Sequence, residues 1–138
     1  MAHTVADFMT PHPTVVEVTD TLRSVAETMA TQDVGALVVA QDGAVVGIVT
    51  DRDLVVRGLA AGAGLDSPVG QLATGTLVSV RPGDGVAEVV QLMRDNAVRR
   101  VPVLDGDRAV GIVTIGDLAV ALDSDSALAD ISAAPAND

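Results

Sequence analysis

The chain has no cysteine, tryptophan or tyrosine among its 138 residues, and Phe8 is its only aromatic residue apart from histidine. Without cysteine there are no disulfides, thiolate zinc sites or thiol nucleophiles, which is compatible with the reducing cytoplasm where we expect the protein. A single aromatic ring offers no platform for stacking single-stranded bases. No apolar run reaches about 18 residues without a charge, and the N-terminus lacks the basic segment and apolar core of a secretory signal. We therefore expect neither a membrane span nor a secretory signal.

Lysine is absent as well, so the eight basic residues are all arginine, against 19 acidic residues and a net charge of −11. Sequence-independent binding of nucleic acid needs a basic stripe, which this sequence does not show. The acidic excess predicts solubility, and an anionic ligand would need a local site that works against the overall field. His3 and His12 stand alone, which predicts no metal site. Nothing supplies a nucleophile with a base and an orienting group, so we expect no enzyme activity.

What the sequence does contain is a repeat with an offset of 64 residues. The segment GIVTDRD (47–53) returns as GIVTIGD (111–117), and the match continues in phase through most of the chain. Two copies predict a paired module rather than a solenoid array, whose repeats usually span about 20–50 residues. The further identical pairs include Thr10 and Thr74, Val16 and Val80, Asp20 and Asp84, Val25 and Val89, Met29 and Met93, Val34 and Val98, Val39 and Val103, Val46 and Val110, Leu54 and Leu118, and Val56 and Val120.

Each copy predicts a β-α-β-β-α unit with a short helical turn before it. Asp20 and Asp84 are expected to cap the first helices, in which apolar residues recur at i, i+3, i+4 and i+7. Two β-rich runs follow, joined by the turns QDG and DGD, and a second helix begins after the repeated heptad. A unit of about fifty residues buries too little surface alone. We therefore expect an α/β (α+β) fold in which the two units pack as a pseudo-two-fold pair.

Composition places the expected boundaries of these units. The first repeat is expected at residues 4–61 and the second at 68–122, with a glycine-rich linker at 62–67 between them. Residues 123–138 are small and acidic and have little to bury, which predicts a flexible tail.

The Thr-x-x-Asp that ends each repeated heptad has two interpretations. In the first it caps the helix: Thr50 or Thr114 is the N-cap, and Asp53 or Asp117 accepts a hydrogen bond from the N–H of the cap. The TVAD at 4–7 fits the same pattern, so the pattern alone is weak evidence. In the second interpretation, the helix start and the threonine hydroxyl receive a phosphate. The aspartate then holds a ribose diol, as an acidic residue does in dinucleotide folds.

These motifs resemble CBS domains, and the tandem resembles a Bateman module. The resemblance covers roughly residues 4–122 and rests on GIVTDRDL, GIVTIGDL, the MTP at 9–11, and VRRVPVLDGDRAVGIVT at 98–114. In size the chain is similar to small stand-alone proteins of the hypoxic-response type, although without cysteine there is no disulfide chemistry to infer. The resemblance implies a regulatory sensor with two clefts, one per repeat, for an adenosine-containing ligand: AMP, ADP, ATP or S-adenosylmethionine.

The resemblance also assigns roles by position. In each copy the aspartate would take ribose hydroxyls, the threonine would contact phosphate or ribose, and the apolar stretch before the first helix would flank the base. These residues are Thr50, Asp53 and Val16 in the first copy, and Thr114, Asp117 and Val80 in the second.

The two copies diverge where family members commonly place a basic residue that meets the phosphate. The second copy has Arg99 and Arg100 there, and the first has Gly and Ala at 35–36. The arginine pair has an alternative interpretation as a solvated strand start, but side chains alternate along a strand, so one of the two should face inward. Arg52 would partly compensate in the first cleft, where Asp51 would repel phosphate. We therefore expect the second cleft to be the better site.

A different class of function is also open: a CBS pair that has lost ligand binding and acts as a dimeric scaffold for a partner protein. The absence of the arginines from the first copy favours this alternative for the first cleft. The second helices, DLVVRGLAAG and DLAVAL, are apolar around most of their circumference, which predicts a homodimer that packs them about a two-fold axis. The expected partners are thus a second copy, an adenine nucleotide and a regulated protein, with no nucleic acid and no membrane.

Overall fold

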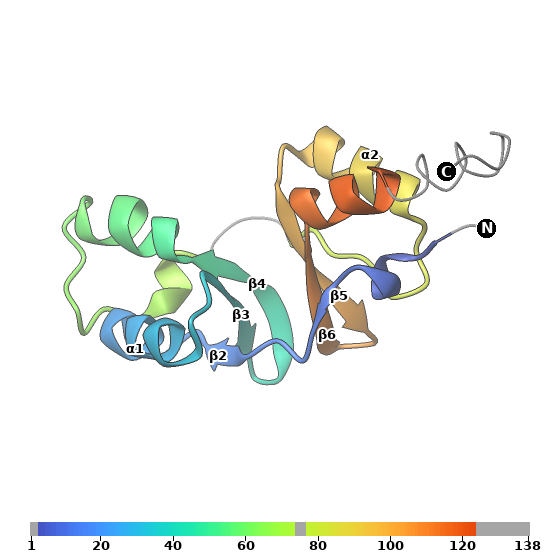
Figure 1. Cartoon of the computed structure of the whole chain (residues 1–138). Helices are drawn as coiled ribbons and strands as arrows, with labels where there is room; N and C mark the ends of the chain where they lie inside the picture. The colour runs from blue at the N-terminus through green and yellow to red at the C-terminus, as the bar shows by residue number, and fades with distance from the viewer. Residues whose placement is uncertain (1–2, 74–76, 124–138) are drawn as a thin grey trace, which may run out of the picture.

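The computed structural model describes residues 3–73 and 77–123. The chain forms two halves that lie side by side, each a small sheet with helices packed on it (Figure 1). The first sheet has the strand order β2-β3-β4 and the second the order β1-β6-β5, which confirms the α/β expectation. In chain order the elements are η1 (Val5–Asp7), β1 (Thr10–Pro11), β2 (Val15–Glu17), α1 (Leu22–Gln32), β3 (Ala36–Gln41), β4 (Ala44–Thr50), η2 (Asp53–Leu59), η3 (Val69–Gln71), α2 (Val86–Asn96), β5 (Arg100–Asp105) and β6 (Arg108–Thr114), and residues 115–123 are helical.

The duplication is visible in the strand pairing. The β3–β4 and β5–β6 hairpins have the same register, since Ala36 pairs with Thr50 and Arg100 with Thr114. Each hairpin turns within two residues. At 42–43 both residues have positive φ, 51° and 86°, as a type I′ turn requires. The turns predicted at QDG and DGD are therefore confirmed.

The first helix of each repeat is confirmed as α1 and α2, each with one buried apolar face. The expected caps are wrong, because each helix begins one residue later than predicted. Thr21 caps α1 with its hydroxyl, and Gly85 stands at the N-cap of α2 without a side-chain bond. Asp20 and Asp84 instead accept a hydrogen bond from the N–H three residues earlier, at 2.9 Å each. They therefore stabilise the turn that precedes the helix.

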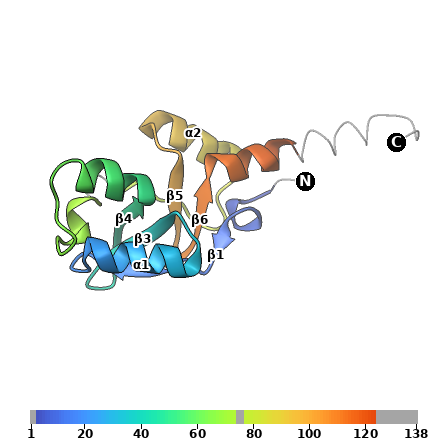
Figure 2. The ribbon, with the colours of Figure 1, turned by 60° about the vertical axis from the view of Figure 1, so that its left-hand side comes forward.

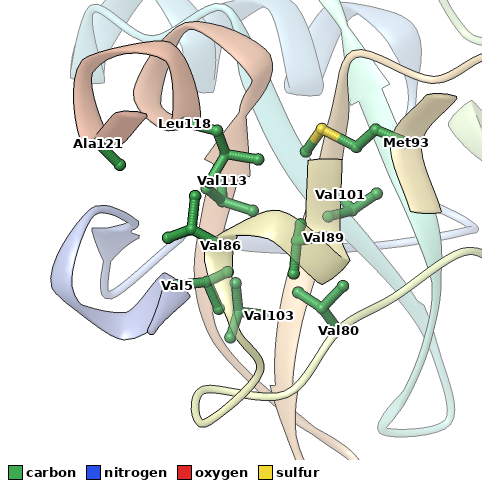
Figure 3. Close-up of a cluster of buried hydrophobic side chains, with 10 residues drawn as sticks. All are labelled: Val5, Val80, Val86, Val89, Met93, Val101, Val103, Val113, Leu118 and Ala121. Carbon is green, nitrogen blue, oxygen red and sulfur yellow. The ribbon is translucent and has the colours of Figure 1, made fainter. Parts of the chain in front are cut away.

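The leading turns of the two repeats are exchanged between the halves. Val5, from the first repeat, is fully buried in the hydrophobic core of the second half, beside Val86 and Val103 (Figure 3). In the same way, Val69 and Leu72, from the second repeat, belong to the core of the first half. Backbone hydrogen bonds anchor both exchanged segments, such as the 2.9 Å bond between the N–H of Val5 and the carbonyl of residue 84. Each core is therefore completed by the other repeat.

The second helices differ between the two copies. In the first copy η2 is a π-helix, and in the second the helix follows β6 directly. The two helices lie on the same side of the molecule, green and orange in Figures 1 and 2. Of the flexible tail expected at 123–138, all but Asp123 lies outside the described residues. None of the helices described is long and apolar enough to cross a membrane.

Candidate ligand-binding site

A hollow of about 480 Å³ lies where the two halves meet. We call it the arginine hollow. Its first-half wall comes from β4 and the residues after it, and its second-half wall comes from the start of β5. The polar groups gather around the repeated Thr-x-x-Asp of the first copy, and the other walls are mainly aliphatic. The hollow is lined by residues 46–48, 50–53, Arg57, 72–73, 77–78, 98–100 and Pro102.

The Thr-x-x-Asp of each repeat forms a reciprocal capping box. The N–H of Thr50 donates to Asp53 Oδ2 at 2.9 Å, and the N–H of Asp53 donates to Thr50 Oγ1 at 3.1 Å. Thr114 and Asp117 form the same two bonds at the same distances. The capping interpretation is thus confirmed at both sites. The two copies do not differ in this local geometry, so any difference between them arises from what surrounds each box.

The surroundings of the first box include a second charged group. Arg57, one helical turn later, places Nη1 3.6 Å from Asp53 Oδ1. The Asp53 side chain is 22% exposed, so its carboxylate is reachable from the hollow although Oδ2 is engaged in the cap. Arg57 was not among the predicted site residues. The signal for it was the i, i+4 spacing from Asp53 in a helix.

Arg99 and Arg100 line the arginine hollow, which contains the Thr-x-x-Asp of the first repeat. The backbone of Arg100 does pair with Thr114, but both arginines are exposed and line the hollow that contains Thr50 and Asp53. The reason is the packing of the halves: the start of β5 lies against β4 of the other half. An arginine of the second repeat therefore reaches the capping box of the first. The arginine pair thus lines the arginine hollow, while its backbone adjoins Thr114 and Ile115 of the second copy, and its assignment to the second cleft stays a prediction.

The arginine hollow is basic in a strongly acidic protein. Arg52, Arg57, Arg99 and Arg100 line it, which is half of the chain's eight basic residues. Two aspartates, at 51 and 53, also line it, so four positive charges face two negative ones. Guanidinium groups that converge from two sides are well suited to an anion, because each offers several donors in a fixed fork.

Val16 and Val80, expected to flank a base, are core residues. Val16 lies in β2 and is 8% exposed, while Val80 is 4% exposed and bridges to Val103 of the neighbouring strand. Neither lines the arginine hollow; Val80 lines a smaller hollow of about 260 Å³ beside the turn at residues 81–84. The aliphatic wall of the arginine hollow comes instead from residues such as Ile48 and Val78.

The described residues contain no group of three or more histidine, aspartate or glutamate side chains placed to hold a metal ion. No side-chain nitrogen or oxygen is both buried and unpaired within that part of the chain. The polar chemistry that the site offers is therefore hydrogen bonding and charge at the rim of the hollow.

A family model described as "CBS domain" matches the chain twice, at residues 5–58 and 69–124. The chain belongs to the CBS-domain family. The resemblance inferred from the repeated motifs is thus confirmed, and the two halves of the molecule are a CBS pair.

Relatives of this CBS pair include Hypoxic response protein 1 of Mycobacterium tuberculosis, which is 39% identical over 120 residues, 84% of this chain and 82% of the relative. The crystal structure of Hypoxic Response Protein I with two coordinated zinc ions superposes with a TM-score of 0.75 at 37% identity, over 86% of this chain and 98% of that one. The CBS domain pair of protein MJ0100, in complex with 5′-methylthioadenosine and S-adenosyl-L-methionine, has a TM-score of 0.78 over 91% of this chain and 99% of that one. At 22% identity this last likeness shows the fold alone.

Proposed function

We propose that this CBS pair is a regulatory module whose arginine hollow binds an adenosine-containing ligand: AMP, ADP, ATP or S-adenosylmethionine. The observation that carries the proposal is that four arginines line one hollow together with aliphatic side chains. A volume of about 480 Å³ lies within the range of small-molecule sites, roughly 300–1,000 Å³. That the CBS pair of MJ0100 holds two adenosine compounds adds support at the level of the fold.

The walls of the hollow suit the parts of such a ligand. Aliphatic side chains such as Ile48 and Val78 form a slot for a purine, which buries apolar surface without needing an aromatic partner. Asp53 caps the helix with Oδ2, and its Oδ1, which lies 3.6 Å from Arg57 Nη1, would accept a hydrogen bond from a ribose hydroxyl. Arg99 and Arg100 approach from the other half and would donate charge-assisted hydrogen bonds to a phosphate.

The regulatory role follows from where the ligand would lie. A molecule held by Asp53 from one half and by Arg99 from the other contacts both sides of the interface. Such a ligand stabilises the arrangement of the halves to which it binds best. Occupancy would thereby be converted into a change in how firmly the two halves pack, which a partner protein can read.

Titration calorimetry with AMP, ADP, ATP and S-adenosylmethionine tests the proposal. We expect binding of at least one of them, together with a rise in the unfolding temperature that grows with ligand concentration. The chain has no tryptophan, tyrosine or cysteine and is almost transparent at 260–280 nm, so a co-purifying nucleotide would dominate its spectrum. If none of the four ligands binds, the proposal fails and the ligand-free dimeric scaffold takes its place.

A further inference from the structure

The duplication allows the arginine hollow to be compared, position by position, with its own second copy. The residues 64 positions away from its lining come from both halves, and we call them the duplicate surface. They are residues 8–9, 13–14, 34–36, 38, 110–112, 114–117 and Ala121. Every arginine of the hollow corresponds there to a glycine or an alanine. The pairs are Arg52 and Gly116, Arg57 and Ala121, Arg99 and Gly35, and Arg100 and Ala36.

The duplicate surface therefore carries the opposite charge. Asp53 corresponds to Asp117, but Asp51 corresponds to Ile115, so one acidic group remains there without any basic group. The arginine hollow has an excess of two positive charges, from four arginines and two aspartates. Since the capping boxes are identical in geometry, the two surfaces differ in charge and not in the Thr-x-x-Asp that marks them.

The duplicate surface also differs at Gly111, which corresponds to Gly47 of the arginine hollow. A Cβ built on Gly111 would lie 2.3 Å from the sulfur of Met9, whereas a Cβ on the corresponding Gly47 would lie 3.8 Å from the methyl of Ala73. Met9 and Ala73 are themselves a corresponding pair, 64 residues apart. Gly111 is accordingly buried, while Gly47 is partly exposed. The long side chain of Met9 thus covers Gly111, whereas the smaller Ala73 leaves Gly47 partly exposed.

Burial follows the same division at the arginine positions. The side chain of Arg57 is 48% exposed at the rim of the hollow. Its counterpart Ala121 is fully buried in the core of the second half, beside Leu118 (Figure 3). Arg57 thus lines the arginine hollow, whereas Ala121 at the corresponding position packs in the core.

We propose that the chain holds one phosphorylated ligand, in the arginine hollow, and that the duplicate surface has lost anion binding and serves for packing. This inference rests on the proposed function and narrows its ligand class to adenosine phosphates. A phosphate carries about −1.5 to −2 at pH 7, which balances the positive excess of the hollow. S-adenosylmethionine has a net positive charge, because its sulfonium and ammonium groups outweigh its carboxylate, and it would add to the positive excess of the hollow.

Calorimetry of the wild-type chain with AMP, adenosine and S-adenosylmethionine gives the first test. We expect one AMP per chain, and at least ten-fold weaker binding of adenosine, which has no anionic group, and of S-adenosylmethionine, whose net charge is positive. Two AMP molecules per chain, or binding of S-adenosylmethionine as tight as that of AMP, would overturn the inference while leaving the proposed function in place.

A matched pair of variants tests whether a long side chain at position 73 blocks the arginine hollow. Ala73→Met copies the residue of the duplicate surface into the arginine hollow and should weaken AMP at least ten-fold, with the unfolding temperature retained. Ala87→Met adds the same side chain at an exposed position of α2 outside the hollow and should bind AMP as the wild type does. AMP binding that survives Ala73→Met in a folded protein contradicts the inference.

A ligand-independent measurement separates this inference from the proposed function. In NMR spectra, pyrophosphate should shift the side-chain Nε–H signals of the four arginines of the hollow and leave the backbone amide signals of Gly116 and Asp117 in place. If AMP does not bind but pyrophosphate gives this pattern, the proposed function fails and the asymmetry stands. Equal shifts on both surfaces, or none on either, refute the asymmetry.

Discussion

A single carboxylate has two roles at the mouth of the arginine hollow. Asp53 Oδ2 accepts a hydrogen bond from the N–H of Thr50, and Asp53 Oδ1 lies 3.6 Å from Arg57 Nη1. Asp117 has only the first of these roles, because the position one turn later is Ala121. Two residues that look the same in the sequence, and that cap their helices with the same distances, are therefore set apart by the groups around them.

Replacing each of these aspartates should separate capping from binding. Loss of a capping interaction costs roughly 0.5–2 kcal/mol, so Asp53→Ala and Asp117→Ala should lower stability by similar amounts in urea titrations. We expect only Asp53→Ala to reduce AMP binding strongly, since Asp53 lines the arginine hollow and Asp117 does not. Asp53→Asn keeps an acceptor for the cap and should restore stability but not affinity. An equal loss of affinity in the two alanine variants would contradict this assignment.

The arginine pair is the second prediction at this scale. Charge-assisted hydrogen bonds contribute roughly 1.5–3 kcal/mol, which is about one to two decades in affinity. Arg99→Ala with Arg100→Ala should therefore weaken AMP by one to two decades and change adenosine little. The control is Arg23→Ala with Arg108→Ala, which alters the net charge equally at exposed positions outside the hollow. The same loss for adenosine and AMP would indicate a packing role instead.

At the scale of elements, the exchanged leading turns bind the two repeats into one molecule. The short η3 segment of the second repeat lies on the core of the first half, where Val69 N–H donates to the carbonyl of Asp20 at 2.7 Å and Gly70 N–H to that of Val18 at 2.9 Å. Leu72 at its end is part of both this core and the wall of the arginine hollow. Docking of this element therefore places one wall of the site.

Gly70→Ala tests the docking of η3. A Cβ at this position would lie 2.8 Å from Val18 Cβ and 3.0 Å from the carbonyl oxygen of Val18, which is backbone and cannot move aside easily. Overpacking of this kind typically costs about 1–3 kcal/mol, and we expect a loss in that range in the free energy of unfolding. Gly83→Ala is the control, because nothing lies within 4 Å of a Cβ there. Unchanged stability of Gly70→Ala would mean that η3 docks differently.

The whole molecule combines a strong net charge with an apolar side. The net charge is −11, yet η2 and the helix at 115–123 each expose large aliphatic side chains. These two helices lie on the same side of the molecule (Figure 2). Val55 is 57% exposed and Val120 is 59% exposed. Apolar groups gathered on one side in this way are typical of a surface that another protein covers.

We predict that the chain forms a homodimer through these two helices, with two-fold symmetry. Light scattering at micromolar concentration should give twice the chain mass of 13.9 kDa. Val120→Asp, at the centre of the exposed apolar side, should shift the protein to monomer. Leu65→Asp changes an exposed apolar residue in a loop away from these helices and should leave the dimer intact. A wild-type monomer under these conditions refutes the prediction.

The sequence by itself determined the features that depend on neighbours along the chain. The offset of 64 residues, the order of helices and strands, the two hairpin turns and the capping boxes at Thr50 and Thr114 are all local, because each depends on residues a few positions apart. The misplaced caps at Asp20 and Asp84 show the limit of this reasoning. Both aspartates accept a hydrogen bond within the turn before the helix, and each helix begins one residue later.

Only the tertiary structure decided which residues meet in the site. The periodicity of the sequence predicts which face of a helix or strand is buried. It does not predict which other element packs against that face. For that reason Val16 and Val80 were expected beside a base although they complete the two cores. For the same reason Arg99 was assigned to the box of its own repeat. β4 and β5 are in contact across the two halves, and residues 98–100 of one repeat line the same hollow as Asp53 of the other.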